Sequence, residues 1–142
     1  NLLGTVYLDS LESPFDAMER LLEDAETPLV IVDFHAEATA EKIAFARYFD
    51  GRVSLIAGTH THVQTADETV LPQGLGYISD AGMTGPILSV LGVKPELAIA
   101  KMKTKMPVRF EYASAPSMLN AVLFEINDKT GKTLSAERIN IQ

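Results

Sequence analysis

The sequence predicts an α/β fold that ends in antiparallel β-structure. Two short apolar runs, at residues 29–34 and 53–57, are typical of buried parallel strands. Segments with apolar residues at helical spacing precede and separate them. Near the end of the chain, Asn-Asp-Lys-Thr-Gly at 127–131 is a turn signal that predicts a hairpin. With 142 residues, of which 46% are hydrophobic, the chain has the size and composition of one domain.

The first predicted helix begins at Pro14. Ser13 is a suitable N-cap, proline fits the first helical position, and Asp16 completes a capping-box spacing. Thr27 and Pro28 end the helix. Acidic residues are frequent up to residue 28, which indicates a solvated outer face. The apolar residues that recur at helical spacing and would face a core are Phe15, Met18, Leu21, Leu22 and Ala25.

The middle of the chain alternates strands and turns after a second helix. Thr39 is expected to cap this helix, which extends over 39–49 and stops at an Asp-Gly pair. A buried strand follows at 53–57. Leu-Pro-Gln-Gly at 71–74 predicts a turn, and a short strand follows at 75–79.

The last part of the chain is expected to hold a helix and a run of strands. Pro95 begins the helix, and its lysines, Lys101, Lys103 and Lys105, lie near the helix C-terminus, where cations are favoured. Residues 1–4, Asn-Leu-Leu-Gly, are interpreted as the end of an apolar strand, so we expect the sequence to be part of a longer protein. The predicted closing strands cover 108–114, 118–126 and 133–141.

Composition excludes several classes of function. The chain has 12 basic and 19 acidic residues and a net charge of -7, which argues against a nucleic-acid binder that works by bulk charge. It has no cysteine, which excludes disulfide frameworks, zinc fingers, iron–sulfur clusters and thiol catalysis. The apolar runs are far shorter than the ~20 residues of a membrane span. We therefore expect no membrane partner, and a reducing compartment, the cytoplasm.

The three histidines all follow predicted strands. His35 comes directly after residues 29–34, and His60 and His62 follow the strand at 53–57. Ligands of open α/β sheets bind at the carboxyl ends of strands, so adjacent parallel strands would bring these imidazoles to one edge. In an extended segment, His-x-His places both side chains on one side. Because imidazole binds zinc, iron and manganese, the pattern predicts a metal site, and the alternative is histidines held by local hydrogen bonds.

Carboxylates near the same edge are candidates for supporting roles or substrate contacts. Asp33, two residues before His35, could orient an imidazole or cap a loop. Glu37 could contact the site or be a solvated loop acid. Asp80 lies in a Gly-rich loop whose backbone N–H groups could contact phosphate, with a tight turn as the alternative. Gly58, at the end of its strand, is expected to let the backbone approach a ligand.

The sequence also resembles the YmdB-like branch of the calcineurin-like metallophosphoesterases. Two motifs carry most of this likeness: Asp-Phe-His-Ala-Glu-Ala-Thr at 33–39, and Gly-Thr-His-Thr-His-Val-Gln-Thr-Ala-Asp at 58–67. Nearly the whole chain takes part. The further matching segments are 1–4, 71–74, 77–86 and 107–110.

The resemblance implies an α/β fold that is the C-terminal half of a four-layer α/β/β/α sandwich with mixed sheets, in which residues 1–142 form one part of a single domain. It also implies a site for two divalent metal ions, with iron or manganese expected and zinc as an alternative. His35 and His60 would bind one metal and His62 the other. The implied activity is hydrolysis of phosphodiesters, with cyclic nucleotides among the substrates, by a water that bridges the metals.

One departure from the family pattern changes what this chain alone is expected to do. The family's N-terminal half supplies Gly-Asp, Gly-Glu-Asn and Gly-Asn-His motifs, which give carboxylate, asparagine and histidine groups to the site, and none of them occurs in this sequence. Three neutral imidazoles cannot offset two divalent cations. We therefore expect the chain alone to bind metal weakly, to contain no catalytic residue that acts by itself, and to need the N-terminal half as its partner.

Two other functions remain open at this point. One is a non-catalytic module that binds a metal or a partner. The other is a mononuclear hydrolase in which the three histidines hold one zinc with an open position. A homo-oligomer is also compatible with the sequence.

Overall fold

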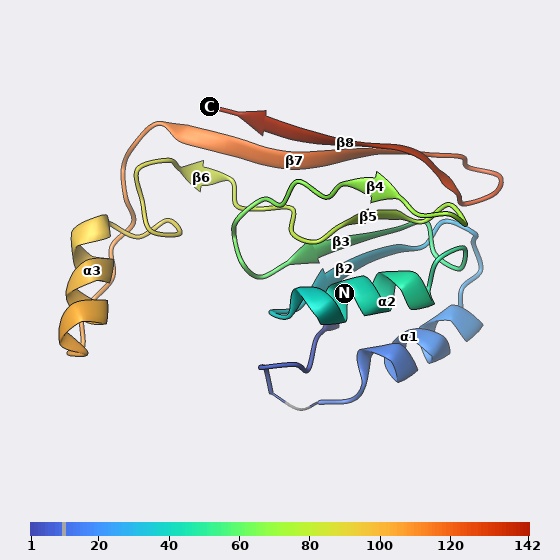
Figure 1. Cartoon of the computed structure of the whole chain (residues 1–142), viewed down its shortest axis with the longest axis horizontal. Helices are drawn as coiled ribbons and strands as arrows, with labels where there is room; N and C mark the ends of the chain where they lie inside the picture. The colour runs from blue at the N-terminus through green and yellow to red at the C-terminus, as the bar shows by residue number, and fades with distance from the viewer. Residues whose placement is uncertain (10) are drawn as a thin grey trace.

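Two β-sheets and three helices make up the part of the chain that the structure describes, residues 1–9 and 11–142, in a computed structural model (Figure 1). The strands are β1 (Leu2–Leu3), β2 (Ile31–His35), β3 (Leu55–Thr59), β4 (Thr69–Val70), β5 (Gly76–Ile78), β6 (Gly85–Pro86), β7 (Ser117–Ile126) and β8 (Thr133–Ile141), and the helices are α1 (Pro14–Glu23), α2 (Thr39–Tyr48) and α3 (Pro95–Thr104). The α/β class and the mixed sheet agree with the prediction.

The larger sheet has the strand order β1-β2-β3-β5-β4. Strands β1, β2, β3 and β5 pair in parallel, and β4 runs antiparallel to β5. The smaller sheet, β6-β7-β8, is antiparallel, and β8 contacts β4 and β5. Helices α1 and α2 cover the opposite face of the larger sheet, while α3 stands apart from both sheets (Figure 1).

An aromatic cluster joins α1 and α2 to the larger sheet. Phe34 of β2 stacks on Phe45 of α2, with ring centroids 4.3 Å apart, and both side chains are fully buried. Phe15 of α1 meets Phe45 edge to face at 5.2 Å, and Phe49 packs on Phe45 at 4.7 Å. Aromatic pairs in these geometries add stability beyond the burial of their area. Of the α1 residues expected to face a core, Phe15, Met18 and Leu22 do so, whereas Leu21 is 54% exposed and Ala25, beyond the end of the helix, is also exposed.

The smaller sheet packs against one end of the larger one. Thr133 of β8 is buried and donates its hydroxyl to the carbonyl of Ser54 at 2.6 Å. A Cβ on Gly76 would meet the ring of Phe124 at 2.8 Å, so the two sheets approach closely there. The predicted hairpin turn is confirmed, because the Asn127 side chain accepts the N–H groups of Lys129 and Thr130 between β7 and β8.

The other end of the larger sheet is open on one face. Val32 and Phe34 of β2 are buried, but Ile31, just before them, is 66% exposed, and Asp33, between them, is also exposed. The expectation of a strand buried on both faces is thus wrong for β2 in this chain. The physical reason is that β7 and β8 lie over β4 and β5 and do not reach this strand (Figure 1).

Several predicted boundaries need correction. Residues 108–114 form no strand, because the segment beside α3 has no neighbouring strand and makes only an isolated bridge from Tyr112 to Val93. Thr39 does not cap α2; the N-cap is Ala38, without a side-chain hydrogen bond. Strands β2 and β3 begin two residues later than the apolar runs at 29–34 and 53–57. The short strands β4 and β6 were not predicted.

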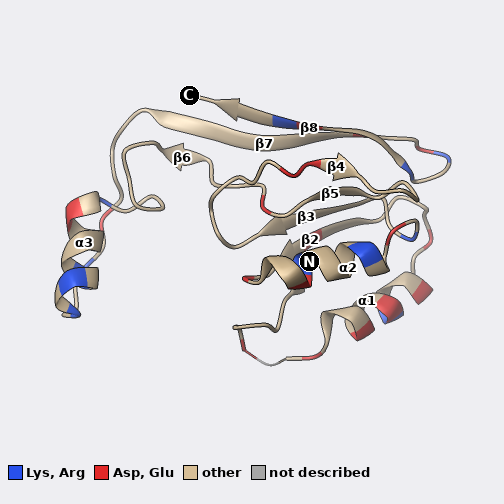
Figure 2. Cartoon of the chain, viewed as in Figure 1, with Lys and Arg blue, Asp and Glu red and all other residues tan. Residues whose placement is uncertain are grey.

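Other local predictions are confirmed. Ser13 caps α1 and accepts the N–H of Asp16, and Pro14 occupies the first turn. Helix α3 begins at Pro95 and ends on Lys105 with a left-handed backbone, φ 60°. Figure 2 marks acidic residues along α1 and basic residues on α3. Among the described residues, no helix is both long enough and apolar enough to cross a bilayer.

Candidate functional site

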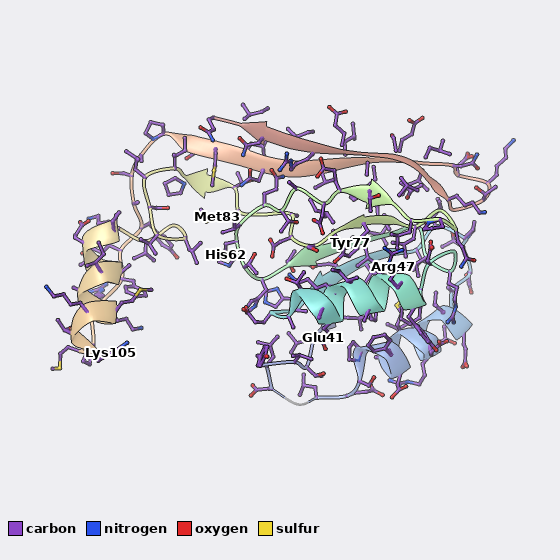
Figure 3. The ribbon with its side chains drawn as sticks, in the orientation of Figure 1. Glu41, Arg47, His62, Tyr77, Met83 and Lys105 are labelled. Carbon is purple, nitrogen blue, oxygen red and sulfur yellow. The ribbon has the colours of Figure 1, made fainter. Side chains whose placement is uncertain are left out.

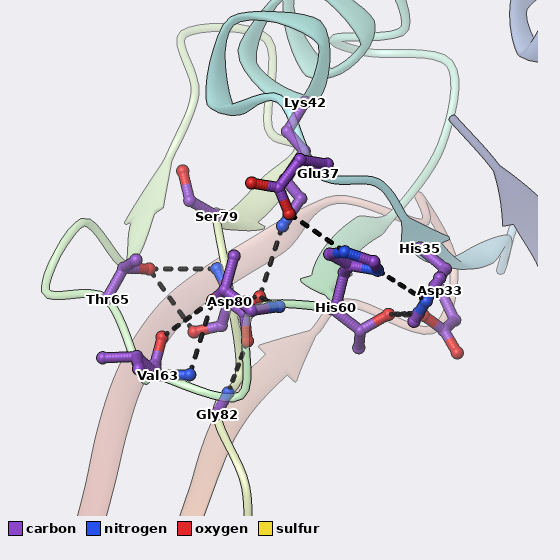
Figure 4. Close-up of polar contacts among 12 residues, drawn as sticks. Asp33, His35, Glu37, Lys42, His60, Val63, Thr65, Ser79, Asp80 and Gly82 are labelled. Carbon is purple, nitrogen blue, oxygen red and sulfur yellow. Dashed lines mark hydrogen bonds and ion pairs between the residues drawn. The ribbon is translucent and has the colours of Figure 1, made fainter. Parts of the chain in front are cut away.

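Two histidines meet at the carboxyl edge of the larger sheet. Strands β2 and β3 are adjacent and parallel, and their register pairs His35 with Thr59, so both strands end together. The ring atoms His35 Nε2 and His60 Nδ1 lie 3.0 Å apart, and the rings meet edge to face (Figure 4). The prediction that the ends of these strands bring imidazoles to one edge holds for this pair.

A chain of hydrogen bonds fixes the orientation of the His35 ring. The Thr59 hydroxyl donates to Asp33 Oδ1 at 2.9 Å, so its oxygen is left to accept from His35 Nδ1 at 3.1 Å. The amide of Asn1 donates to the other Asp33 oxygen at 2.8 Å. This pattern assigns the ring proton to Nδ1 and makes Nε2 of His35 an acceptor, which faces His60 Nδ1 at 3.0 Å.

A carboxylate completes a short row of polar groups. Glu37 Oε2 lies 2.9 Å from His60 Nε2, so both ring nitrogens of His60 have partners: Glu37 on one side and His35 on the other. The Glu37 side chain is half-exposed, and the His60 side chain is less so. The row His35–His60–Glu37 thus joins two imidazoles and one acidic group at a surface that solvent can reach.

The segment from His60 to His62 is not extended, which corrects one expectation. The chain leaves the extended conformation after Thr59: His60 has a φ of 112° and His62 a φ of 66°. These positive φ angles are not those of an extended strand, so the alternation expected for His-x-His does not apply here. His62 is exposed and lines a pocket beside Met83, whose N–H donates to the His62 carbonyl at 3.1 Å (Figure 3).

The Asp80 carboxylate accepts hydrogen bonds from the His-Thr-His loop and fixes its position. Its Oδ2 accepts the backbone N–H of Thr61 at 2.9 Å, the Thr61 hydroxyl at 2.8 Å and Lys42 Nζ at 3.3 Å, and its Oδ1 accepts the N–H of Gly82 at 2.9 Å (Figure 4). Asp80 and Lys42 are both 2% exposed. The Asp80 carboxylate therefore contacts the loop between the two histidines and is closed to solvent.

The pKa of Asp80 is lowered by these donors. Burial by itself would raise it, because desolvation penalises the charged form. The hydrogen bonds from Gly82 and Thr61 and the charge of Lys42 together outweigh that cost. Asp80 is thus held as a carboxylate whose negative charge fixes the loop.

Gly58 has a different neighbour from the one expected. A Cβ at this position would overlap the carbonyl oxygen of Ser79, and the Gly58 carbonyl accepts the N–H of Ala81 at 2.8 Å. The close approach is therefore made by the chain that leaves β5, not by a ligand. Because Gly58 has no side chain, the segment of Ser79 and Asp80 can approach it closely, and Asp80 reaches the histidine loop.

Sequence reasoning missed three supporting residues. Thr59 links Asp33 to His35, Thr61 joins the histidine loop to Asp80, and Lys42 neutralises Asp80. Lys42 carried a signal: it lies three and seven residues before Phe45 and Phe49, within the apolar stripe of α2. A charged residue within such a stripe indicates a buried partner of opposite charge.

The donor atoms at this edge are of the types that bind transition metals, but there are too few of them for a complete site. Imidazole nitrogen and carboxylate oxygen both bind zinc, iron and manganese. Among the residues that the structure describes, however, no three His, Asp or Glu side chains already form a metal-binding group. His35 and His60 with Glu37 form a row and do not surround one point. A complete site needs further donors.

Comparison with known proteins places this geometry in a family. The sequence model described as YmdB-like protein matches residues 1–139. The chain belongs to the YmdB-like family. The 2',3'-cyclic-nucleotide 2'-phosphodiesterase of Bacillus subtilis (strain 168) is 48% identical to this YmdB-like chain over 143 residues, which cover 99% of the chain and 54% of that relative. The resemblance stated from the two histidine motifs is thereby confirmed.

Two solved structures share the fold of this YmdB-like chain. A hypothetical protein from Thermus thermophilus superposes with a TM-score of 0.92 at 39% identity, over 98% of this chain and 54% of that one. A structure titled as a novel phosphatase of Mycoplasma pneumoniae superposes with a TM-score of 0.90 at 42% identity, over 99% of this chain and 51% of that one. The chain spans about half the length of the curated relatives it matches.

Proposed function

We propose that this chain is the C-terminal part of a metal-dependent phosphodiesterase domain. The observation that carries the proposal is the meeting of His35 and His60 at the carboxyl edge of the sheet, with an oriented lone pair on His35. The names of the similar proteins, a cyclic-nucleotide phosphodiesterase and a phosphatase, support the same reaction class. Cyclic nucleotides are the substrates we expect.

His35 and His60 would hold one divalent ion and His62 a second, with iron or manganese expected and zinc as the alternative. Asp33, acting through Thr59, positions the His35 ring, and Asp80 positions the loop that carries His60 and His62. Glu37 would contact the metal or the substrate. Such ions polarise a phosphoryl oxygen and make water a stronger nucleophile near neutral pH.

A further segment must supply the remaining donors. The incomplete set of metal-binding groups among the described residues and the uncovered face at Ile31 both support this view. The relatives are about twice as long as this chain, which fits an N-terminal half that joins or binds it. We expect the chain alone to hydrolyse phosphodiesters very slowly or not at all. A homo-oligomer and a cytoplasmic location are further expectations, the latter from the lack of cysteine.

The test is hydrolysis of a bis-aryl phosphodiester by the protein that contains this chain together with its N-terminal segment, in Mn²⁺ or Fe²⁺. His60→Ala and His62→Ala should each reduce turnover by at least about 100-fold, because each removes a metal ligand. Gln73→Ala, in the turn between β4 and β5, is the matched control and should keep full activity. Retained turnover in both histidine variants would exclude the assignment.

A non-catalytic module is the second candidate, and the incomplete donor set at the histidine edge is the observation that favours it. Metal analysis of the purified protein separates the two. Tight, stoichiometric metal without hydrolysis in the presence of the N-terminal segment would favour the module, whereas metal with hydrolysis favours the enzyme. One zinc with hydrolysis by the chain alone would favour a mononuclear three-histidine site.

A further inference from the structure

A pocket of about 600 Å³ adjoins His62, and its lining does not include the row His35–His60–Glu37. It lies between the His62 loop, the segment that includes β6, and the inner face of β7 and β8. Small-molecule sites occupy roughly 300–1,000 Å³, so this pocket can enclose a ligand larger than a phosphate ion. The residues of its walls determine which kind of group it would bind.

One wall carries a fixed set of polar groups. Strands β7 and β8 pair Asn120 with Asn140 and Val122 with Arg138, so these side chains share a face, and three of them line the pocket. Asn140 Nδ2 donates to Asn120 Oδ1 at 2.6 Å, and Asn120 Nδ2 donates to the carbonyl of Met83 at 2.8 Å. These bonds hold Asn120 in place and connect this wall to the opposite one.

Arg138 supplies a positive charge to the same wall. Its Nε lies 3.8 Å from Glu68 Oε1, within ion-pair distance, and Arg138 lines the pocket. Among the described residues that line the pocket, Arg138 is the one Lys or Arg side chain, and 38% of its side chain is exposed. A planar guanidinium binds phosphate through two parallel hydrogen bonds and also stacks on aromatic rings.

The remaining walls are apolar and include two thioethers. Met83 and Met118 both line the pocket, together with Pro86, Ile87 and Leu91. Methionine sulfur makes favourable contacts with aromatic rings, and its flexible side chain adapts to a flat group. Apolar walls with thioethers and one cation fit a ligand that combines an aromatic ring with an anion.

We propose that this pocket binds the nucleoside group of a nucleotide or cyclic nucleotide, with the phosphate between Arg138 and His62. The base would lie against Met83 and Met118, and Asn140 would meet its polar edge. This inference rests on the proposed function for its choice of substrate class. Arg138 and the two methionines would then determine which phosphodiesters the protein accepts.

Binding of adenosine 3'-monophosphate tests this proposal without metal or turnover. In the chain labelled with carbon-13 at the methionine methyl groups, nucleotide should shift the signals of Met83 and Met118. Met102 and Met106, on and just after α3, lie outside the pocket and serve as internal references. Shifts confined to the reference methionines, or no shift at saturating nucleotide, would contradict the proposal.

Substitutions and simpler probes complete the experiment. Arg138→Gln should weaken nucleotide binding about tenfold, because a charge-assisted contact is lost, whereas Arg109→Gln removes the same charge outside the pocket and should have no effect. Leu91→Trp, at a position 51% exposed, should fill the pocket and block binding without unfolding the chain. Inorganic phosphate that binds as tightly as the nucleotide, with no response to adenosine, would overturn the assignment to a nucleoside.

These outcomes are independent of the test of hydrolysis. Nucleotide binding that depends on Arg138, with no hydrolysis by the protein that includes the N-terminal segment, would support the pocket and contradict the proposed enzyme. Hydrolysis that depends on His60, with nucleotide binding unchanged in Arg138→Gln, would support the proposed enzyme and contradict the proposed role of the pocket.

Discussion

A single buried acid connects the core of this chain to its histidines. Asp80 receives donors from the His-Thr-His loop, from its own Gly-rich loop and from Lys42 of α2. A buried ion pair contributes little by itself to stability, but removing one partner leaves the other buried and uncompensated. At the level of single residues, the histidine loop therefore depends on a carboxylate that is closed to solvent.

Asp80→Asn tests this dependence. The substitution leaves the Lys42 ammonium buried without a counter-charge and should lower the free energy of unfolding by about 3–5 kcal/mol. Lys42→Met should cost less, because Asp80 keeps its three hydrogen bonds to Thr61 and Gly82. Urea denaturation followed by circular dichroism measures both. Equal losses in the two variants would mean that the loop does not depend on the Asp80 charge.

Acid should weaken the fold through Asp67 and Asp80. Burial alone would raise the pKa of Asp67, but hydrogen bonds from Ser79 and Thr65 outweigh it, and the pKa is lowered, as it is for Asp80. A folded-state pKa below the unfolded value of about 3.9 gives stability that is complete above that value. This stability is lost as the pH falls through the folded pKa.

Urea midpoints measured against pH check the sign. The wild-type midpoint should stay level from about pH 7 to about pH 5 and fall below about pH 4. The urea midpoint of Asp67→Asn should be lower at neutral pH and should fall less steeply as the pH is lowered, because asparagine cannot take up a proton. An unchanged slope in this variant would show that other groups control the acid response.

Among the elements, the register of β2, β3 and β5 creates the edge that carries the histidines. Parallel pairing of β2 with β3 sets His35 beside Thr59, and pairing of β3 with β5 brings the Asp80 loop under the histidine loop. Gly58 permits the second of these approaches, because the Ser79 carbonyl occupies the space of a side chain. The position of the histidines is thus a product of strand pairing.

Gly58→Ala should disturb this pairing. The added methyl group would overlap a backbone oxygen, which cannot rotate away, so overpacking should cost about 1–3 kcal/mol or more of unfolding free energy. Gly85→Ala is the matched control, because its nearest contact would be the flexible end of Met83 at 3.5 Å, and it should change stability by no more than about 0.5 kcal/mol. Thermal unfolding compares the two variants directly.

Across the molecule as a whole, two apolar surfaces lie uncovered. The outer face of β7 and β8 presents Leu119, Leu123 and Ile141, which are 42%, 57% and 58% exposed. Ile31 is uncovered on the larger sheet. Exposed apolar side chains that lie together on one face mark an interaction site.

Leu123→Lys should therefore reduce self-association of the isolated chain without lowering its melting temperature, since it breaks the apolar surface at an exposed position. Leu21→Lys is the matched control: Leu21 is 54% exposed on α1, and α1 lies on the opposite side of the larger sheet from β7 and β8 (Figure 1). Sedimentation velocity at several concentrations measures the effect. A similar reduction of self-association in both variants would mean that the effect comes from the change in net charge alone.

Local signals in the sequence were enough to predict some of the elements and the family. Ser13 and Pro14 start α1 because capping is a contact within one turn, and the 127–131 hairpin follows from its own turn residues. The two histidine motifs identified the family because their residue types are specific. Segments without such local signals, such as 108–114, were mispredicted, since pairing depends on a neighbour that the sequence does not show.

The way the site is built, by contrast, follows from contacts that form only when the chain folds. Positive φ angles at His60 and His62 replace the extended backbone that the His-x-His alternation assumes, and the N–H of Thr61 between them donates to Asp80. Folding also places Lys42 in the core and Arg138 beside the pocket next to His62. These arrangements depend on contacts between residues far apart in the chain, which no local pattern encodes.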